Sequence, residues 1–181
     1  WVALFGGDPL YAPYSKGMTE RQEKNRAEAK EAFRSISAAL DAGDIAKAGT
    51  VARDLSAIAI SYAGAEDCRF LVRETKARAA MPERKGKGTV AALRQAVDAA
   101  AAAPDPKQAL ALARKALEIS PVNFEANFLA GRAAVQGGSA KTALDPLVTA
   151  RTVESTFDVR AWLGRALRAA GRPTEAVAEF E

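Results

Sequence analysis

The first part of the chain combines a charged stretch with amphipathic stretches at helical spacing. Residues Thr19–Gly43 are polar and charged for about three turns before Phe33, Ile36 and Leu40 recur at the spacing of one helix face. Ile45–Ala59 then carries a second apolar stripe. The pattern predicts a helical hairpin whose charged beginning is a solvated helix that protrudes beyond the core. An alternative is that this charged half binds a partner.

An additional helix and a linker follow this hairpin. Gly64–Met81 has the apolar spacing of one more helix. Residues 82–89 begin with the run PERKGKG, a basic stretch interrupted by glycine, which predicts a linker and a boundary or bend in the chain. A phosphate-binding loop is the alternative, although these glycines do not have the spacing of a phosphate cradle.

The C-terminal part of the chain repeats a spacing of 33 residues. Small or apolar residues recur at this interval in two successive segments, each with the pattern of helix, glycine-bearing turn and helix. The matching pairs are Gly131 and Gly164, Gly138 and Gly171, Ala143 and Ala176, and Leu147 and Phe180. A fixed period of this length is typical of a solenoid built from stacked helical hairpins.

A related unit, Val90–Pro121, precedes these two segments. Its residues 104–106 have the sequence PDP, which predicts a turn with Pro106 at the start of a helix, where its missing N–H has little cost. Asn123 is placed to cap the helix that follows. Pro146 lies close enough to the start of its own helix to predict a slightly late helix start or a gentle bend.

The arrangement in the C-terminal segments resembles the tetratricopeptide repeat (TPR) family. The matching features are Gly131 in the first helix, Gly138 at the turn, and Ala143 followed by a large apolar residue in the second helix. The resemblance implies an all-α fold, a right-handed α-solenoid of antiparallel helix pairs with about nine helices. Gly131 and Gly164 are the expected points where paired helices cross, so a bulky replacement should cost about 1–3 kcal/mol.

The chain is therefore expected to have four parts. They are an extended N-terminal arm at 1–17, an N-terminal helical region at 18–81, the basic linker at 82–89 and a TPR-like array at 90–181. Within the helical region, Ala29–Ala59 resembles a degenerate hairpin of the same kind, and the extra helix follows it. The array comprises units 90–122, 123–156 and 157–181, of which the last is incomplete, so we expect Phe180 to lack a covering helix.

Both ends suggest a piece of a longer chain, because there is no initiator Met and the last helix pattern is not capped. Trp1–Lys16 is rich in apolar, aromatic and turn residues, which predicts an extended arm packed on the first helices. In one alternative Trp1–Phe5 end an upstream transmembrane segment, and in another the arm binds in a groove. The compartment is left open between the cytoplasm and a soluble domain tethered to a membrane.

Composition and charge favour a binding module over an enzyme. Hydrophobic residues make up 49% of the chain but aromatic residues only 7%, and the abundant alanine suits closely stacked helices. The net charge of +4 is well short of the concentrated basic stripe of a dedicated nucleic-acid binder. Histidine is absent, and the single cysteine, Cys68, is expected to be a small buried residue, because no imidazole can activate it. These features predict no catalytic residue, no cofactor and no metal.

The resemblance implies that the first helices of successive units line a concave surface that binds the ligand. Six residues are placed on this surface: Arg94, Phe128, Arg132, Val135, Arg165 and Arg168. Because guanidinium groups bind carboxylates through two parallel hydrogen bonds, we expect a partner with acidic or C-terminal carboxylate groups. The alternative is that these arginines form a solvated face whose stems cover apolar surface. Trp162 either packs in the core or faces the ligand, and the lysines and asparagines of the family's carboxylate clamp are not reproduced.

The sequence thus predicts a non-catalytic scaffold that binds a partner protein or peptide and belongs to a longer chain. Two alternatives remain open. One is nucleic-acid binding through basic residues of the linker and the C-terminal groove, against which Glu125 and Asp158 argue. The other is the recruitment domain of an enzyme whose catalytic part lies outside this sequence. Membrane association is expected only through a segment upstream of Trp1.

Overall fold

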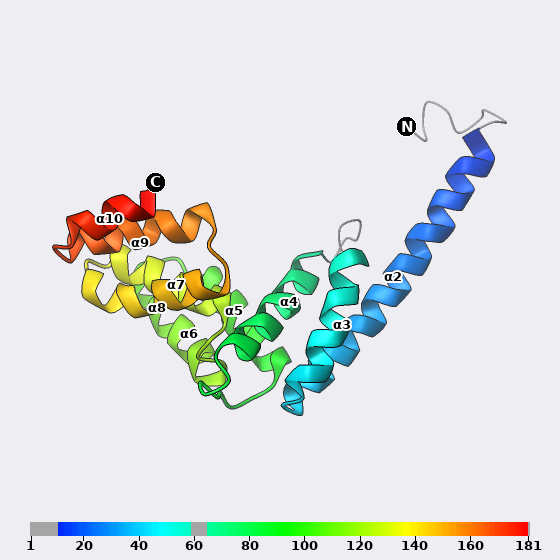
Figure 1. Cartoon of the computed structure of the whole chain (residues 1–181), viewed down its shortest axis with the longest axis horizontal. Helices are drawn as coiled ribbons and strands as arrows, with labels where there is room; N and C mark the ends of the chain where they lie inside the picture. The colour runs from blue at the N-terminus through cyan, green and yellow to red at the C-terminus, as the bar shows by residue number, and fades with distance from the viewer. Residues whose placement is uncertain (1–10, 59–64, 181) are drawn as a thin grey trace.

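The computed structural model describes residues 11–58 and 65–180, and this part of the chain contains nine helices and no strand. The predicted all-α class is therefore confirmed. The helices are α2 (Tyr11–Asp41), α3 (Ile45–Ile58), α4 (Ala65–Ala80), α5 (Val90–Ala101), α6 (Pro106–Ile119), α7 (Phe124–Gln136), α8 (Ala140–Val153), α9 (Phe157–Ala169) and α10 (Pro173–Phe180). Figure 1 shows α2 and α3 side by side at one end of the molecule, α5 to α10 stacked at the other end, and α4 between them.

The helices are arranged as four hairpins plus α4. Contacts join α2 to α3, α5 to α6, α7 to α8 and α9 to α10. Between hairpins, α7 packs against both α5 and α9, while α4 contacts α2, α3, α7 and α8. The first helices of the last three hairpins thus lie next to one another, and the extra helix predicted at 64–81 is confirmed as α4.

The same glycine turn closes three of the hairpins. Gly43, Gly138 and Gly171 have φ angles of 75°, 76° and 79°, a left-handed conformation that costs glycine nothing. At each turn the glycine N–H donates to the carbonyl three residues earlier, and the next N–H donates to the carbonyl five residues before it. This is the Schellman arrangement, which satisfies carbonyls left open at a helix C-terminus. The α2–α3 hairpin therefore ends its first helix as the two C-terminal hairpins do.

Gly131 and Gly164 lie where paired helices cross, as the sequence predicted. A Cβ atom at Gly131 would overlap the side chain of Leu147 on α8, and one at Gly164 would overlap the ring of Phe180 on α10. Leu147 is fully buried, whereas Phe180 is 56% exposed.

In the two other hairpins, the larger side chain at the corresponding positions is on the first helix and the smaller one is on the second helix. In α5 and α6 these positions hold Val97 and Ala113, and in α2 and α3 they hold Ile36 and Ala52; all four side chains are buried in one core cluster. Where the first helix has a large residue, the second helix thus has alanine. Where the first helix has glycine, the second helix has a large residue. Exchanging the sizes in this way keeps the total volume at the crossing within narrow limits, which close packing requires.

Helix starts follow the predicted capping residues. The Asn123 side chain accepts a hydrogen bond from the Ala126 N–H at 2.8 Å, and Pro106 is the first residue of α6, so both predictions are confirmed. Of the two outcomes predicted for Pro146, a late helix start or a gentle bend, the late start is wrong, because α8 begins at Ala140 and contains Pro146 in its second turn. Proline removes one backbone hydrogen bond there, but the buried neighbours Ala143 and Leu147 hold the helix against α7.

The N-terminal arm is shorter than predicted. Residues 11–17 were expected to be extended but belong to α2, because a proline in the first turn of a helix, here Pro13, has no N–H bond to lose. Residues 1–10 of the predicted arm lie outside the described residues. From Glu20 to Glu28 the helix is almost entirely exposed, and Ala29 is the first fully buried residue among the described side chains. The predicted solvated, protruding half of the first helix is therefore confirmed.

Candidate functional site

The six predicted ligand-binding residues lie on three neighbouring helices. Arg94 is on α5, Phe128, Arg132 and Val135 are on α7, and Arg165 and Arg168 are on α9. Because α7 contacts α5 and α9, these residues belong to adjacent first helices, as the resemblance implied. Arg165 and Arg168 are exposed, whereas the other four are half-buried.

Three of these arginines cover aromatic rings. The guanidinium carbon of Arg94 lies 5.1 Å from the ring centre of Phe70, that of Arg132 lies 5.8 Å from Phe128, and that of Arg165 lies 4.7 Å from Trp162. Arg94 also forms an ion pair with Asp98 at 3.0 Å. Each cation is thus partly engaged by this protein's own side chains through cation–π attraction or pairing. Trp162 is half-buried and packs against the core cluster of α7 to α10.

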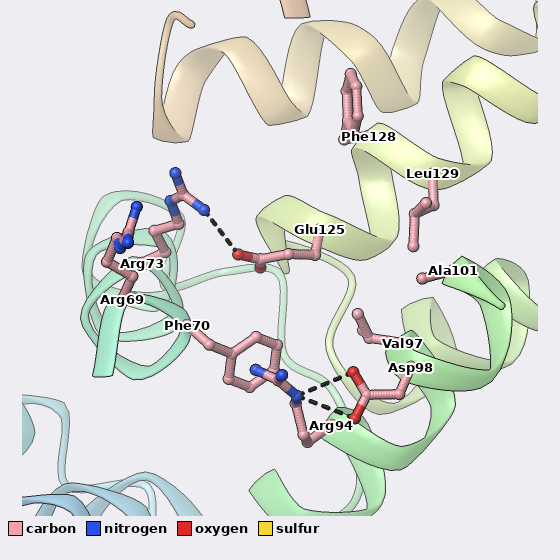
Figure 2. A pocket seen from close by; sticks show the side chains of 10 residues that line it. All are labelled: Arg69, Phe70, Arg73, Arg94, Val97, Asp98, Ala101, Glu125, Phe128 and Leu129. Carbon is pink, nitrogen blue, oxygen red and sulfur yellow. Dashed lines mark hydrogen bonds and ion pairs between the residues drawn. The ribbon is translucent and has the colours of Figure 1, made fainter. Parts of the chain in front are cut away.

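A pocket of about 290 Å³ lies between α4, α5 and α7 (Figure 2). Of the six predicted residues it contains Arg94 and Phe128, and Val97 and Leu129 also line it. Its other wall is α4, which had no role in the sequence-based prediction. The residues that α4 contributes are Arg69, Phe70 and Arg73.

A second pocket, of about 520 Å³, adjoins the first. It is bounded by α2, α4 and α5 and shares Phe70, Arg94 and Asp98 with the first pocket. We refer to the two adjoining pockets as the groove. Phe33 and Ser37 of α2 line its far part, and the Ser37 hydroxyl is buried without a hydrogen-bond partner among the described residues.

Arg73 ties α4 to the stacked hairpins. Its guanidinium donates to Glu125 on α7 at 3.1 Å and to Glu154 at the end of α8, and it lies 4.5 Å from the ring centre of Phe124. Burial alone would lower the pKa of Arg73, but the hydrogen bonds to Glu154 and Glu125 raise it above its ordinary value. Arg73 therefore stays charged and serves as a structural bridge at the edge of the groove.

Glu125 is the one groove carboxylate with an unsatisfied oxygen. Its Oε1 accepts from Arg73, while Oε2 is buried with no hydrogen-bond partner among the described residues. Burial raises the pKa of Glu125, and the nearby charge of Glu74 adds to this effect, although the bonds to its own backbone and to Arg73 oppose it. In contrast, Arg69 is exposed and forms no ion pair with another described residue. The groove thus offers an available cation and an unused acceptor.

A buried polar cluster fixes the position of α4. Glu74 is fully buried and accepts hydrogen bonds from Arg78 at 2.7 Å and from the Asn123 side chain at 2.9 Å. Arg78 also donates to the Leu40 carbonyl at the end of α2. The residue that caps α7 and the carbonyl that ends α2 are thus connected through α4, which holds the walls of the groove together.

The described part of the chain contains Asp and Glu side chains but no histidine, and its one cysteine is Cys68. No group of three or more His, Cys, Asp or Glu side chains is placed there to hold a metal ion. Cys68 is buried, as predicted. None of the helices at 11–58 and 65–180 is both long and apolar enough to cross a membrane.

Comparison of the chain with models of protein families, with curated proteins and with solved structures finds no match.

Proposed function

We propose that this protein is a non-catalytic interaction module, a TPR-like right-handed array that binds a partner protein or peptide. The binding surface consists of the groove together with the exposed faces of α7 and α9. The observation that carries the proposal is the groove itself, because two adjoining pockets, lined by aromatic rings and arginines from four helices, form one continuous path.

The chemistry of this surface suits a peptide with acidic groups and apolar side chains. Arg69, Arg165 and Arg168 are exposed cations that belong to one connected set of helices. Phe70 and Phe128 provide apolar walls between them. Carboxylates of the partner would pair with the guanidinium groups, while its apolar residues would pack on the rings.

Two other functions are less well supported. Nucleic-acid binding would use the same arginines, but the side chains of Asp98 and Glu125 line the groove, where carboxylates would repel phosphates. A recruitment role for an enzyme located elsewhere in a longer chain is a special case of partner binding.

The test is selection of peptides from a random library on the immobilised protein. Peptides selected on the wild type should bind the double variant Arg132→Glu, Arg165→Glu about tenfold more weakly, because both cations on the first helices are reversed. The matched control is Arg114→Glu, Lys115→Glu, which makes the same charge change at exposed positions on α6. Circular dichroism verifies that both variants are folded.

The outcomes separate the alternatives. Equal loss of binding in both double variants would mean that only net charge matters. No selected peptide, together with binding of single-stranded nucleic acid that weakens steeply with salt, would replace this proposal with the nucleic-acid function.

A further inference from the structure

The linker between α4 and α5 covers a separate cavity. This cavity has a volume of about 530 Å³ and shares only Asp41 with the groove. Its walls come from the ends of α2 and α4, the start of α3, the linker and Ser120, which follows α6. Its volume lies in the range of about 300–1,000 Å³ that is usual for small-molecule sites.

The linker is held in place over this cavity. A Cβ atom at Gly86 would overlap the backbone of Ile119 and Ser120, so the linker lies directly on the end of α6. Gly88 has a φ of 132°, which favours glycine. Arg84 donates to the Thr149 hydroxyl at 2.9 Å and thereby fastens the linker to α8. The glycines of the PERKGKG run therefore serve close backbone approach, and the basic residues that precede them, Arg84 and Lys85, line the cavity.

Ser120 provides an unused hydrogen-bonding group in the cavity wall. The residue is 1% exposed, and its hydroxyl has no hydrogen-bond partner within the described residues. Its backbone is satisfied, since the N–H donates to the Ala116 carbonyl and the carbonyl accepts from Asn123. A buried hydroxyl without a partner is unfavourable, and a ligand that accepts its proton would remove the penalty.

The cavity has a surplus of positive charge. Arg78, Arg84 and Lys85 line it, against the single carboxylate of Asp41. Arg78 is occupied by Glu74 and the Leu40 carbonyl, and Asp41 accepts from the Val90 N–H. Lys85 is exposed and has no ion pair with a described residue, while Arg84 donates to Thr149 and has a 4.0 Å contact to Asp145. Lys85 is therefore available to bind an anion, and the Arg84 guanidinium, which has five N–H donors, keeps others for the same purpose.

We propose that this cavity binds a small molecule that carries a phosphate group. The phosphate would accept hydrogen bonds from Lys85, Arg84 and the Ser120 hydroxyl, because it offers three strong acceptor oxygens and up to two negative charges. The remainder of the molecule would lie against the apolar wall formed by Leu40, Ile45 and Met81. This site goes beyond the proposed partner-binding function and does not depend on it.

The experiment is calorimetric titration of the full chain with phenyl phosphate, which combines a phosphate with an apolar ring. Saturable binding is expected, with weaker binding of inorganic phosphate and none of phenol. Lys85→Gln and Ser120→Ala should each reduce the affinity for phenyl phosphate about tenfold, the usual effect of one hydrogen bond to a charged group. Lys87→Gln is the matched control, because Lys87 lies on the same linker but does not line the cavity.

Thermal unfolding without ligand separates binding from folding. Ser120→Ala should unfold no earlier than the wild type, because its hydroxyl makes no hydrogen bond to lose. The proposal is overturned if phenyl phosphate shows no saturable binding, or if Lys85→Gln and Ser120→Ala bind it as tightly as the wild type. Loss of affinity in Lys87→Gln equal to that in Lys85→Gln would also overturn it, since linker charge alone would then explain the binding.

Discussion

Two carboxylates in the stack of α5 to α10 show how local surroundings set the pH response of single residues. Burial raises the pKa of Glu125, so this group stabilises the folded state most below its ordinary pKa, and that contribution is lost as the pH rises through the raised value. The hydrogen bond from Arg172 lowers the pKa of Glu175, so its contribution is present above its ordinary pKa and is lost as the pH falls.

We therefore expect opposite pH trends for two conservative variants. Between about pH 4 and about pH 7, the stability of Glu125→Gln relative to the wild type should increase, because glutamine has no buried charge to form. The relative stability of Glu175→Gln should instead decrease as the pH rises towards the ordinary pKa of about 4.5 and then stay constant at higher pH. Urea unfolding at a series of pH values measures both. If the difference in stability between Glu125→Gln and the wild type does not change with pH, the hydrogen bond from Arg73 already offsets the cost of burying the Glu125 carboxylate.

At the scale of the elements, helix crossings depend on the sum of two side-chain volumes. Gly131 accommodates Leu147 between α7 and α8, whereas Val97 is matched by Ala113 between α5 and α6. The same crossing is thus packed in two ways within one chain, which makes the size exchange testable by substitution.

Gly131→Val alone should lower the free energy of unfolding by about 1–3 kcal/mol, because its side chain overlaps Leu147. Adding Leu147→Ala should restore part of this loss, since the pair then has the sizes found at Val97 and Ala113. Chemical denaturation of the two single variants and the double variant gives the coupling. Gly49→Ala is the control, because the added methyl meets open space and should stabilise α3 by about 0.5–1 kcal/mol. If the change in unfolding free energy of the double variant equals the sum of the two single changes, residues 131 and 147 do not compensate for each other in size.

The sequence predicted features of the helices correctly where the interactions that form them are local. Caps, turn glycines and crossing glycines act within one hairpin, so Asn123, Gly138 and Gly164 could be placed correctly. The groove could not be foreseen, because its wall is α4, and Arg73 reaches partners 52 and 81 residues away. Such contacts leave no periodic trace in a single sequence. The start of α2 and the position of Pro146 were misjudged because helix boundaries depend on packing as well as on breakers.

At the scale of the whole molecule, α4 joins the α2–α3 hairpin to the stack formed by α5 to α10. The connection combines a shared apolar core, which includes Phe70 and Leu71 of α4, with polar contacts of Arg73, Glu74 and Arg78. Because the carboxylate of Glu74 is fully buried, its two hydrogen bonds replace the water that it has lost.

Glu74→Ala should therefore destabilise the protein by about 3–5 kcal/mol, since Arg78 and Asn123 would both lose a buried partner. Hydrogen exchange should accelerate first in α2 to α4 and at the start of α7, while the α9–α10 hairpin keeps its protection. Glu175→Ala, which removes an exposed ion pair, serves as the comparison and should leave exchange unchanged. If hydrogen exchange in Glu74→Ala accelerates equally along the chain, α4 does not join two parts that can unfold separately.

The protruding half of α2 also sets a distance. From Tyr11 to Ala29, the first fully buried residue among the described side chains of α2, the helix rises by about 27 Å at the usual 1.5 Å per residue. Anything attached near Tyr11 would thus be held away from the groove by a stiff rod rather than by a flexible tether. A fluorescent label near Tyr11 would report the tilt of this part of α2. A partner bound in the groove would be kept at a fixed distance from any group attached near Tyr11.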